Sequence, residues 1–142
     1  MAEDFEKLAK DAIAAVYAKD PLAPADQVAK AVAPLISRAG MASSDPHAPI
    51  VAVVKGAIGG VLLAGQSVPE AAIKTLEMLP NISLMTRSGP ENLMSWVMEG
   101  VAEVMPLAGP AIQDEVRAKI EEKYMGASTL FDEQCLAAKA RG

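Results

Sequence analysis

The segment from residue 47 to residue 65, HAPIVAVVKGAIGGVLLAG, constrains the fold more than any other part of the chain. It is long enough for one helix and almost wholly apolar, yet it carries interior glycines, each of which costs about 1 kcal/mol relative to alanine. Small residues recur every fourth position along one side of such a helix: Ala48, Ala52, Gly56, Gly60 and Ala64. A row of this kind lets two helix backbones approach closely. The other sides carry valine, leucine and isoleucine, so we expect the helix to be buried on most sides.

Three kinds of contact would offset the cost of these glycines: a bilayer, a ligand cavity or another helix. A membrane span needs about 20 apolar residues, whereas this segment is shorter and includes Lys55. We therefore favour a contact with another helix, either the alanine-bearing first helix (Ala9, Ala12) or a second copy of the same helix. A ligand cavity against the glycines is the alternative. We expect Lys55 at a solvent edge, or otherwise facing a carboxylate of a partner or ligand.

Apolar residues at three- and four-residue spacing predict helices over about 3–19 and 24–39, which together form an N-terminal hairpin, residues 1–40. Pro34 should kink or shorten the second of them. Residues 41–46 read as a linker. Alanine, the best helix former and a poor strand former, is abundant throughout, and no alternating strand pattern is present.

The second half of the chain is also divided by helix signals. In SVPE (67–70) and SGPE (88–91) a serine stands three residues before a glutamate, which is a capping box and predicts helices that begin near 68 and near 89. The helix that begins near 89 should end at Pro106. Another should start at Pro110 and end at Gly126, and a last one should cover about 129–140.

These signals predict an all-α, single-domain bundle of six to seven helices, since 142 residues suffice for one domain. The hairpin would pack on a main bundle, residues 47–126, whose central helix is buried and rich in glycine and alanine. Residues 127–142 would form a C-terminal helix.

Charge and cysteine content exclude several classes of function. The net charge is −5 and the lysines and arginines are scattered, which argues against nucleic acid and against an anionic membrane surface as partners. Cys135 is the only cysteine, so neither a disulfide framework nor a cysteine zinc site is expected, and a reducing, cytoplasmic setting fits. The charged N-terminus has no apolar core of a signal peptide.

Few residues carry a pattern that suggests chemistry. Glu99 and Glu103 are spaced as a carboxylate pair on one helix face, which can do acid–base work or hold a cation, but such a stripe is also typical of a solvated helix side. His47 is the only histidine and cannot assemble a histidine-rich metal site, so we expect it at the surface of a helix start. We predict no catalytic residue, cofactor or metal site.

Methionines and the sole tryptophan form a second apolar face, on the helix that begins near 89. Methionine suits irregular cores and adaptable binding surfaces, and tryptophan is a frequent interface anchor. The candidate interface or ligand-facing residues are therefore Ala52, Gly56, Gly60, Ala64, Met94, Trp96, Met98 and Met105. The polar candidates are Lys55, Glu99 and Glu103.

Because the small-residue row and the methionine–tryptophan face both lack an obvious partner, we expect a non-enzymatic helical interaction module or small assembly subunit. It would self-associate or bind another helical protein. The alternative is a carrier of a small apolar ligand, in a pocket lined by Gly56, Gly60, Met94, Met98 and Trp96. An enzyme that uses Glu99 and Glu103 is the weaker alternative.

Overall fold

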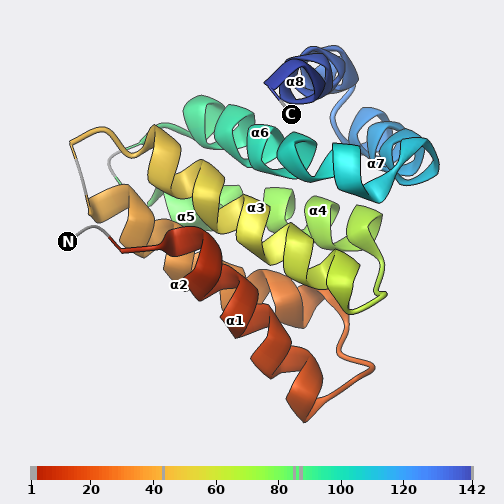
Figure 1. Ribbon diagram of the computed structural model, residues 1–142. Coiled ribbons are helices and arrows are strands. Elements are labelled where there is room, and N and C mark those ends of the chain that lie inside the picture. Colours follow the sequence, from red (N-terminus) through yellow and green to blue (C-terminus); the bar gives the residue numbers. More distant parts are fainter. Residues whose placement is uncertain (1–2, 43, 85, 87, 142) are drawn as a thin grey trace.

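Eight helices follow one another through the residues that the computed structural model describes, which are 3–42, 44–84, 86 and 88–141 (Figure 1). The helices are α1 (Phe5–Lys19), α2 (Ala25–Met41), α3 (His47–Leu63), α4 (Val68–Glu77), α5 (Leu79–Ser83), α6 (Pro90–Ala108), α7 (Pro110–Lys123) and α8 (Ala127–Arg141). The predicted all-α class is confirmed, with eight helices in place of six or seven. The additional one is the single-turn helix α5. The predicted segments 1–40, 41–46, 47–126 and 127–142 each include a few residues outside the described ranges.

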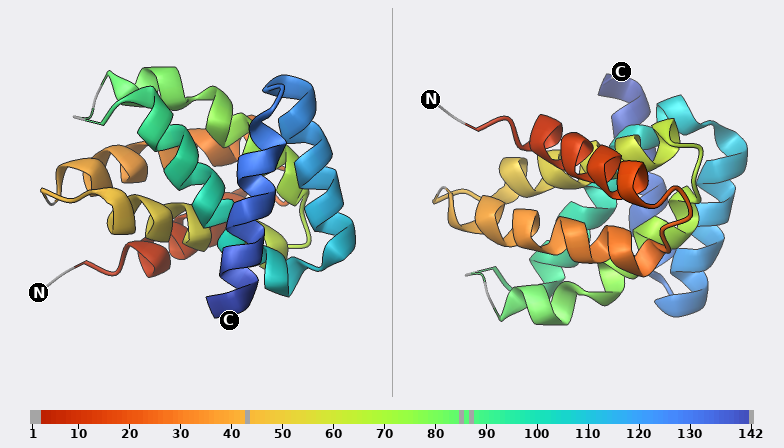
Figure 2. Two further views of the ribbon diagram at one scale, coloured as in Figure 1. Left: turned by 90° about the horizontal axis from the view of Figure 1, so that it is seen from above. Right: turned by 90° about the horizontal axis from the view of Figure 1, so that it is seen from below.

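The bundle is organised as a stack around α3. The main packing runs from α1 through α3 and α6 to α8. In Figure 1, α1 and α2 lie on one side of α3, α6 lies on the other, and α8 lies beyond α6. Figure 2 shows α7 beside α8, with α8 crossing over α6. The α8 helix therefore forms an outer layer that packs on the bundle through α6 and α7.

The central helix α3 is buried along most of its length, as the sequence predicts. Its buried residues are Ile50, Val51, Val53, Val54, Gly56, Ala57, Ile58, Gly60 and Val61. The helix ends at Leu63, and Gly65 follows with a φ of 70°. Glycine adopts this left-handed conformation without the clash that a Cβ would cause, so it is suited to end a helix.

Two prolines lie inside helices, where the sequence predicts a kink or shortening at Pro34 and the end of a helix at Pro106. Pro34 lies inside α2, which continues to Met41, and Pro106 lies inside α6, which continues to Ala108. Both prolines are on the exposed side of their helix, where water can reach the carbonyl group that proline leaves without a donor. The α6 helix ends at Ala108, and its C-cap is Gly109, whose φ is 96°.

The two predicted capping boxes have different outcomes. Ser67 caps α4, because its hydroxyl accepts a hydrogen bond from the Glu70 backbone N–H at 3.3 Å. The prediction for Ser88 is wrong: the N-cap of α6 is Gly89, which makes no side-chain cap. The Ser88 backbone N–H instead donates to the Thr86 hydroxyl at 3.3 Å. This local turn competes with the cap for the same segment.

Within the described ranges, no helix combines the length and the apolar character that crossing a membrane requires.

Candidate functional site

The small-residue row on α3 is the contact surface for α1. A Cβ atom added at Gly56 would lie 2.0 Å from the backbone carbonyl oxygen of Glu6, and one added at Gly60 would lie 3.1 Å from the Cβ of Ile13. The two backbones therefore touch at Gly56. Among the alanines of the row, Ala52 is half-buried, whereas Ala48 and Ala64 at its two ends are exposed. The glycines thus face a helix of the same chain, so their side of α3 offers no ligand cavity.

A third glycine makes the corresponding contact on the other side of α3. A Cβ added at Gly100 on α6 would lie 2.6 Å from the Cβ of Val54 and 3.0 Å from the Val51 carbonyl oxygen. Sequence reasoning missed Gly100, although a lone glycine inside an apolar helix is itself a signal of close packing. The central helix is therefore held at short range on two sides, each time through a missing side chain.

The methionine–tryptophan face belongs largely to the core. Met98 and Met105 are buried, and Met94 and Trp96 are half-buried against the same core. The indole of Trp96 stacks on the imidazole of His47, with ring centroids 5.3 Å apart and ring planes 23° apart. Most of this face is therefore occupied within the chain.

His47 joins the start of α3 to α6 instead of lying free at the surface. Its Nε2 lies 2.9 Å from Oε1 of Glu99, and its backbone N–H donates to Oδ1 of Asp45 at 3.3 Å. The imidazole itself is therefore held by two contacts, the carboxylate of Glu99 and the indole of Trp96. The described residues contain no group of three His, Cys, Asp or Glu side chains that could hold a metal ion.

A charged row continues from there across four helices. The ammonium group of Lys55 on α3 lies 3.8 Å from a Glu6 carboxylate oxygen on α1 and 3.9 Å from one of Glu103 on α6. Glu103 also accepts a hydrogen bond from Arg141 on α8 at 2.8 Å. Partly exposed ion pairs of this kind each stabilise the folded state by up to about 1 kcal/mol. Glu99 and Glu103 are thus each paired with cationic or ionisable side chains of other helices, and these pairs link α6 to α3 and α8.

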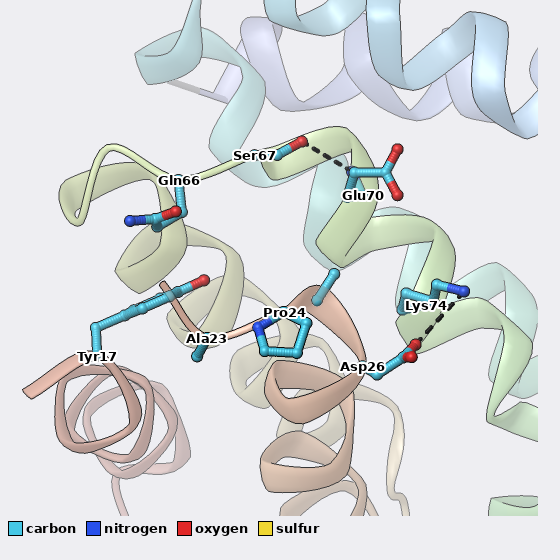
Figure 3. Close-up of a pocket in the computed structure, with 9 residues that line it drawn as sticks. Tyr17, Ala23, Pro24, Asp26, Gln66, Ser67, Glu70 and Lys74 are labelled. Carbon is cyan, nitrogen blue, oxygen red and sulfur yellow. Dashed lines mark hydrogen bonds and ion pairs between the residues drawn. The ribbon is translucent and has the colours of Figure 1, made fainter. Parts of the chain in front are cut away.

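A cavity of about 270 Å³ lies between the α1–α2 connection and the start of α4 (Figure 3). It is lined by Tyr17, Ala23, Pro24, Ala25, Asp26, Gln66, Ser67, Glu70 and Lys74. Burial raises the pKa of the Tyr17 phenol. The side-chain amide of Gln66 donates to the Pro21 carbonyl at 3.0 Å, which ties the two connections together.

The charges around this cavity are already paired. Lys74 lies 3.4 Å from an Asp26 carboxylate oxygen, and Glu70 lies 2.8 Å from the ammonium group of Lys119 on α7. The hydrogen bond and charge of Lys119 lower the pKa of Glu70. The cavity therefore has the character of a packing defect between two tied connections, with its polar groups engaged by neighbours.

A larger cavity, about 430 Å³, lies where α6 ends, α7 begins and α8 passes. We call it the α6–α8 groove. It is lined by Met105, Pro106, Gly109, Pro110, Gln113, Asp114, Cys135, Leu136 and Lys139. Its floor includes the buried Met105 and Cys135, and on its rim Leu136 is 70% exposed. Leu107, which follows Pro106, is 81% exposed. Of these residues, only Met105 is among the candidates predicted from the sequence.

Cys135 should make the folded protein less stable at alkaline pH. Burial, with a further contribution from the charge of Asp132, raises the pKa of its thiol from 9.0 to about 11. The folded state therefore favours the protonated thiol: the stabilisation is complete below pH 9 and is lost as the pH rises toward 11. Relative to Cys135→Ala, the wild-type free energy of unfolding should fall by about 2 kcal/mol between pH 8 and pH 11. Denaturant unfolding of both proteins at several pH values measures this difference. Equal pH dependence of the two would contradict it, as would rapid alkylation of the native thiol at neutral pH.

Comparisons with protein-family models, curated proteins and solved structures found no match for this chain. The function is therefore argued from the geometry of the described residues alone.

Proposed function

We propose that this protein is a non-enzymatic helical interaction module that self-associates, and that a second copy docks at the α6–α8 groove. The observation that carries the proposal is an open cavity with Met105 and Cys135 in its floor and a largely exposed leucine, Leu136, on its rim. Apolar surface of this kind, bordered by polar groups, is typical of protein–protein contact sites.

The state of the polar candidates supports a binding role over a chemical one. An acid–base mechanism needs a carboxylate that can reach a substrate and exchange a proton with it. Glu99 is held by His47 and Glu103 by Lys55 and Arg141. Neither lines any of the cavities described above.

The location of the interface differs from the one suggested by sequence patterns. Gly56 and Gly60 of α3 are covered by α1, and Met98 is buried in the core, so these residues are not available to a partner. Leu136, on the rim of the groove, is the exposed leucine that a second copy would cover. Burial of a leucine side chain contributes about 2 kcal/mol, so a few such contacts are significant for association.

The proposal predicts that the protein changes mass with concentration. Sedimentation velocity over about a hundredfold range of concentration should show a shift from one chain of 14.8 kDa toward two chains, because association follows mass action. Leu136→Glu should shift the equilibrium toward the monomer, since it places a charge where apolar surface would be buried.

Two results would contradict the proposal. One is a single chain at every concentration. The other is a monomer that retains a few hundred daltons of bound small molecule in native mass spectrometry and loses it on denaturation, which would indicate a carrier of a small ligand. A matched control is Leu22→Glu, because Leu22 is also largely exposed, at 86%, but lies in the α1–α2 connection, outside the groove.

A further inference from the structure

We infer that the two copies meet about a two-fold axis that runs along the α6–α8 groove, so that α7 of each copy packs against α8 of the other. This inference rests on the proposed function, because it specifies the arrangement of the self-associated form. It is carried by the opposite charges on the two walls of the groove, Asp114 and Lys139.

The groove has two walls of different composition. One wall is the first turns of α7, with Pro110, Gln113 and Asp114. The other is the second half of α8, with Leu136 and Lys139. Each wall therefore carries an apolar residue and a charged residue, and the α7 wall also carries the polar Gln113.

The two charged residues have opposite signs, and the charge of Asp114 also acts on Arg117, whose pKa is raised mainly by Asp132 and further by Asp114. Asp114 and Lys139 are both exposed. Among the residues that the structure describes, neither takes part in an ion pair. Most other charges on α7 and α8 do: Arg117 pairs with Asp132 at 2.9 Å, and Lys119 and Arg141 pair with Glu70 and Glu103, each at 2.8 Å.

A two-fold axis along the groove exchanges the walls between copies. In a two-fold contact every pair of touching residues occurs twice. If residue i of one copy touches residue j of the other, then residue j of the first copy touches residue i of the second. The α7 wall of one copy faces the α8 wall of the other, which brings each Asp114 within reach of the partner's long lysine side chain. Leu136 then covers apolar surface at the partner's α7 wall. Both charge pairs and both leucine contacts form at once.

Charge complementarity favours a second copy over a partner whose surface carries charge of one sign. A partner that is purely acidic or purely basic would satisfy one wall and repel the other. The chain carries a net charge of −5, so two copies repel each other at long range. A local match of opposite charges in the contact is what allows identical molecules to approach in this orientation.

Charge exchange tests the arrangement without disturbing the fold, since both residues are exposed. Asp114→Lys alone would place two lysines opposite each other at both sites, and Lys139→Glu alone would place two carboxylates there. Each should weaken the dimer about tenfold or more in sedimentation equilibrium. The double variant Asp114→Lys/Lys139→Glu restores opposite charges and should regain dimerisation to within about threefold of the wild type.

Matched controls are Asp11→Lys and Lys7→Glu, which change the charge equally on the exposed side of α1, far from α8 (Figure 1). They should leave the dimer unchanged. A wild-type dimer that is insensitive to the single exchanges, or a double variant that is weaker than both, would overturn this arrangement and leave the proposed self-association standing. A wild-type protein that is monomeric throughout would instead contradict the proposed function itself.

Discussion

Replacing Gly56 by alanine is expected to destabilise the protein by about 3 kcal/mol or more, or to prevent folding altogether. The new Cβ would lie 2.0 Å from the carbonyl oxygen of Glu6 and within 3 Å of two other backbone atoms of the same residue. Backbone atoms cannot move aside as a flexible side chain can, so α1 would have to shift as a unit. Overpacking in a well-packed core typically costs about 1–3 kcal/mol. A Cβ that clashes with the backbone of another helix should cost at least as much as the top of that range.

Gly59→Ala on the same helix is the matched control. A Cβ added at Gly59 meets nothing within 4 Å, so alanine should raise the free energy of unfolding by up to about 1 kcal/mol through its better helix propensity. Denaturant unfolding followed by circular dichroism measures both variants. Equal effects of the two substitutions, in either direction, would mean that α1 does not rest on α3 at Gly56.

The second large effect is expected at Phe131, the residue that anchors α8. Its side chain is 0% exposed and is among the largest that are fully buried in the protein. Phe131→Ala should cost about 3–5 kcal/mol, because it removes the buried ring and leaves a cavity between α8 and the layer beneath it. For a chain of this size we expect the thermal midpoint to fall by about 10–15 °C.

Leu130→Ala is the control on the same helix, one residue away and 37% exposed. It should cost about 1 kcal/mol or less. Differential scanning calorimetry of both variants, at a protein concentration low enough to keep them monomeric, separates core packing from association. A small effect of Phe131→Ala would indicate that α8 is not docked through this ring.

The sequence predicts the helices well, because their signals are local. Ser67 caps the helix that starts after it, and α3 is buried as its apolar sides require. The errors arise where a local signal is overridden by packing or by a competing turn. Pro106 stays inside a helix that the core supports on its opposite side. Ser88 is drawn into a turn with Thr86 and does not cap α6.

The partner of the glycine row was predictable only in part. The pattern on α3 indicates a close helix, and α1 was one of the two candidates. Its contact surface, however, uses the backbone of Glu6 and the side chain of Ile13, whereas Ala12 is half-exposed. The rotation of a docked helix depends on all its neighbours, so the pattern of one helix does not determine it.

The groove could not be predicted, because it exists only once three segments meet. Met105 on its floor reads as one more core methionine, and Leu136 reads as an ordinary residue of an alanine-rich helix. What creates the cavity is the change of direction at Gly109 together with the path of α8. The spacing of apolar residues along the sequence determines neither the angle between α6 and α7 nor the path of α8.

The glycines of α3 also determine how far along α3 the first helix can slide. Glu6 lies over Gly56 and Ile13 over Gly60, so the two helices run in the same direction. A slide of one turn one way would place the Glu6 carbonyl over Ala52, and a slide the other way would place Ile13 over Ala64. The first shift sets the Ala52 Cβ against a backbone oxygen that leaves it no space, and the second crowds the Ala64 Cβ against the side chain of Ile13. Two hydrogen atoms in place of side chains therefore fix the register of the α1–α3 pair as firmly as they fix its separation.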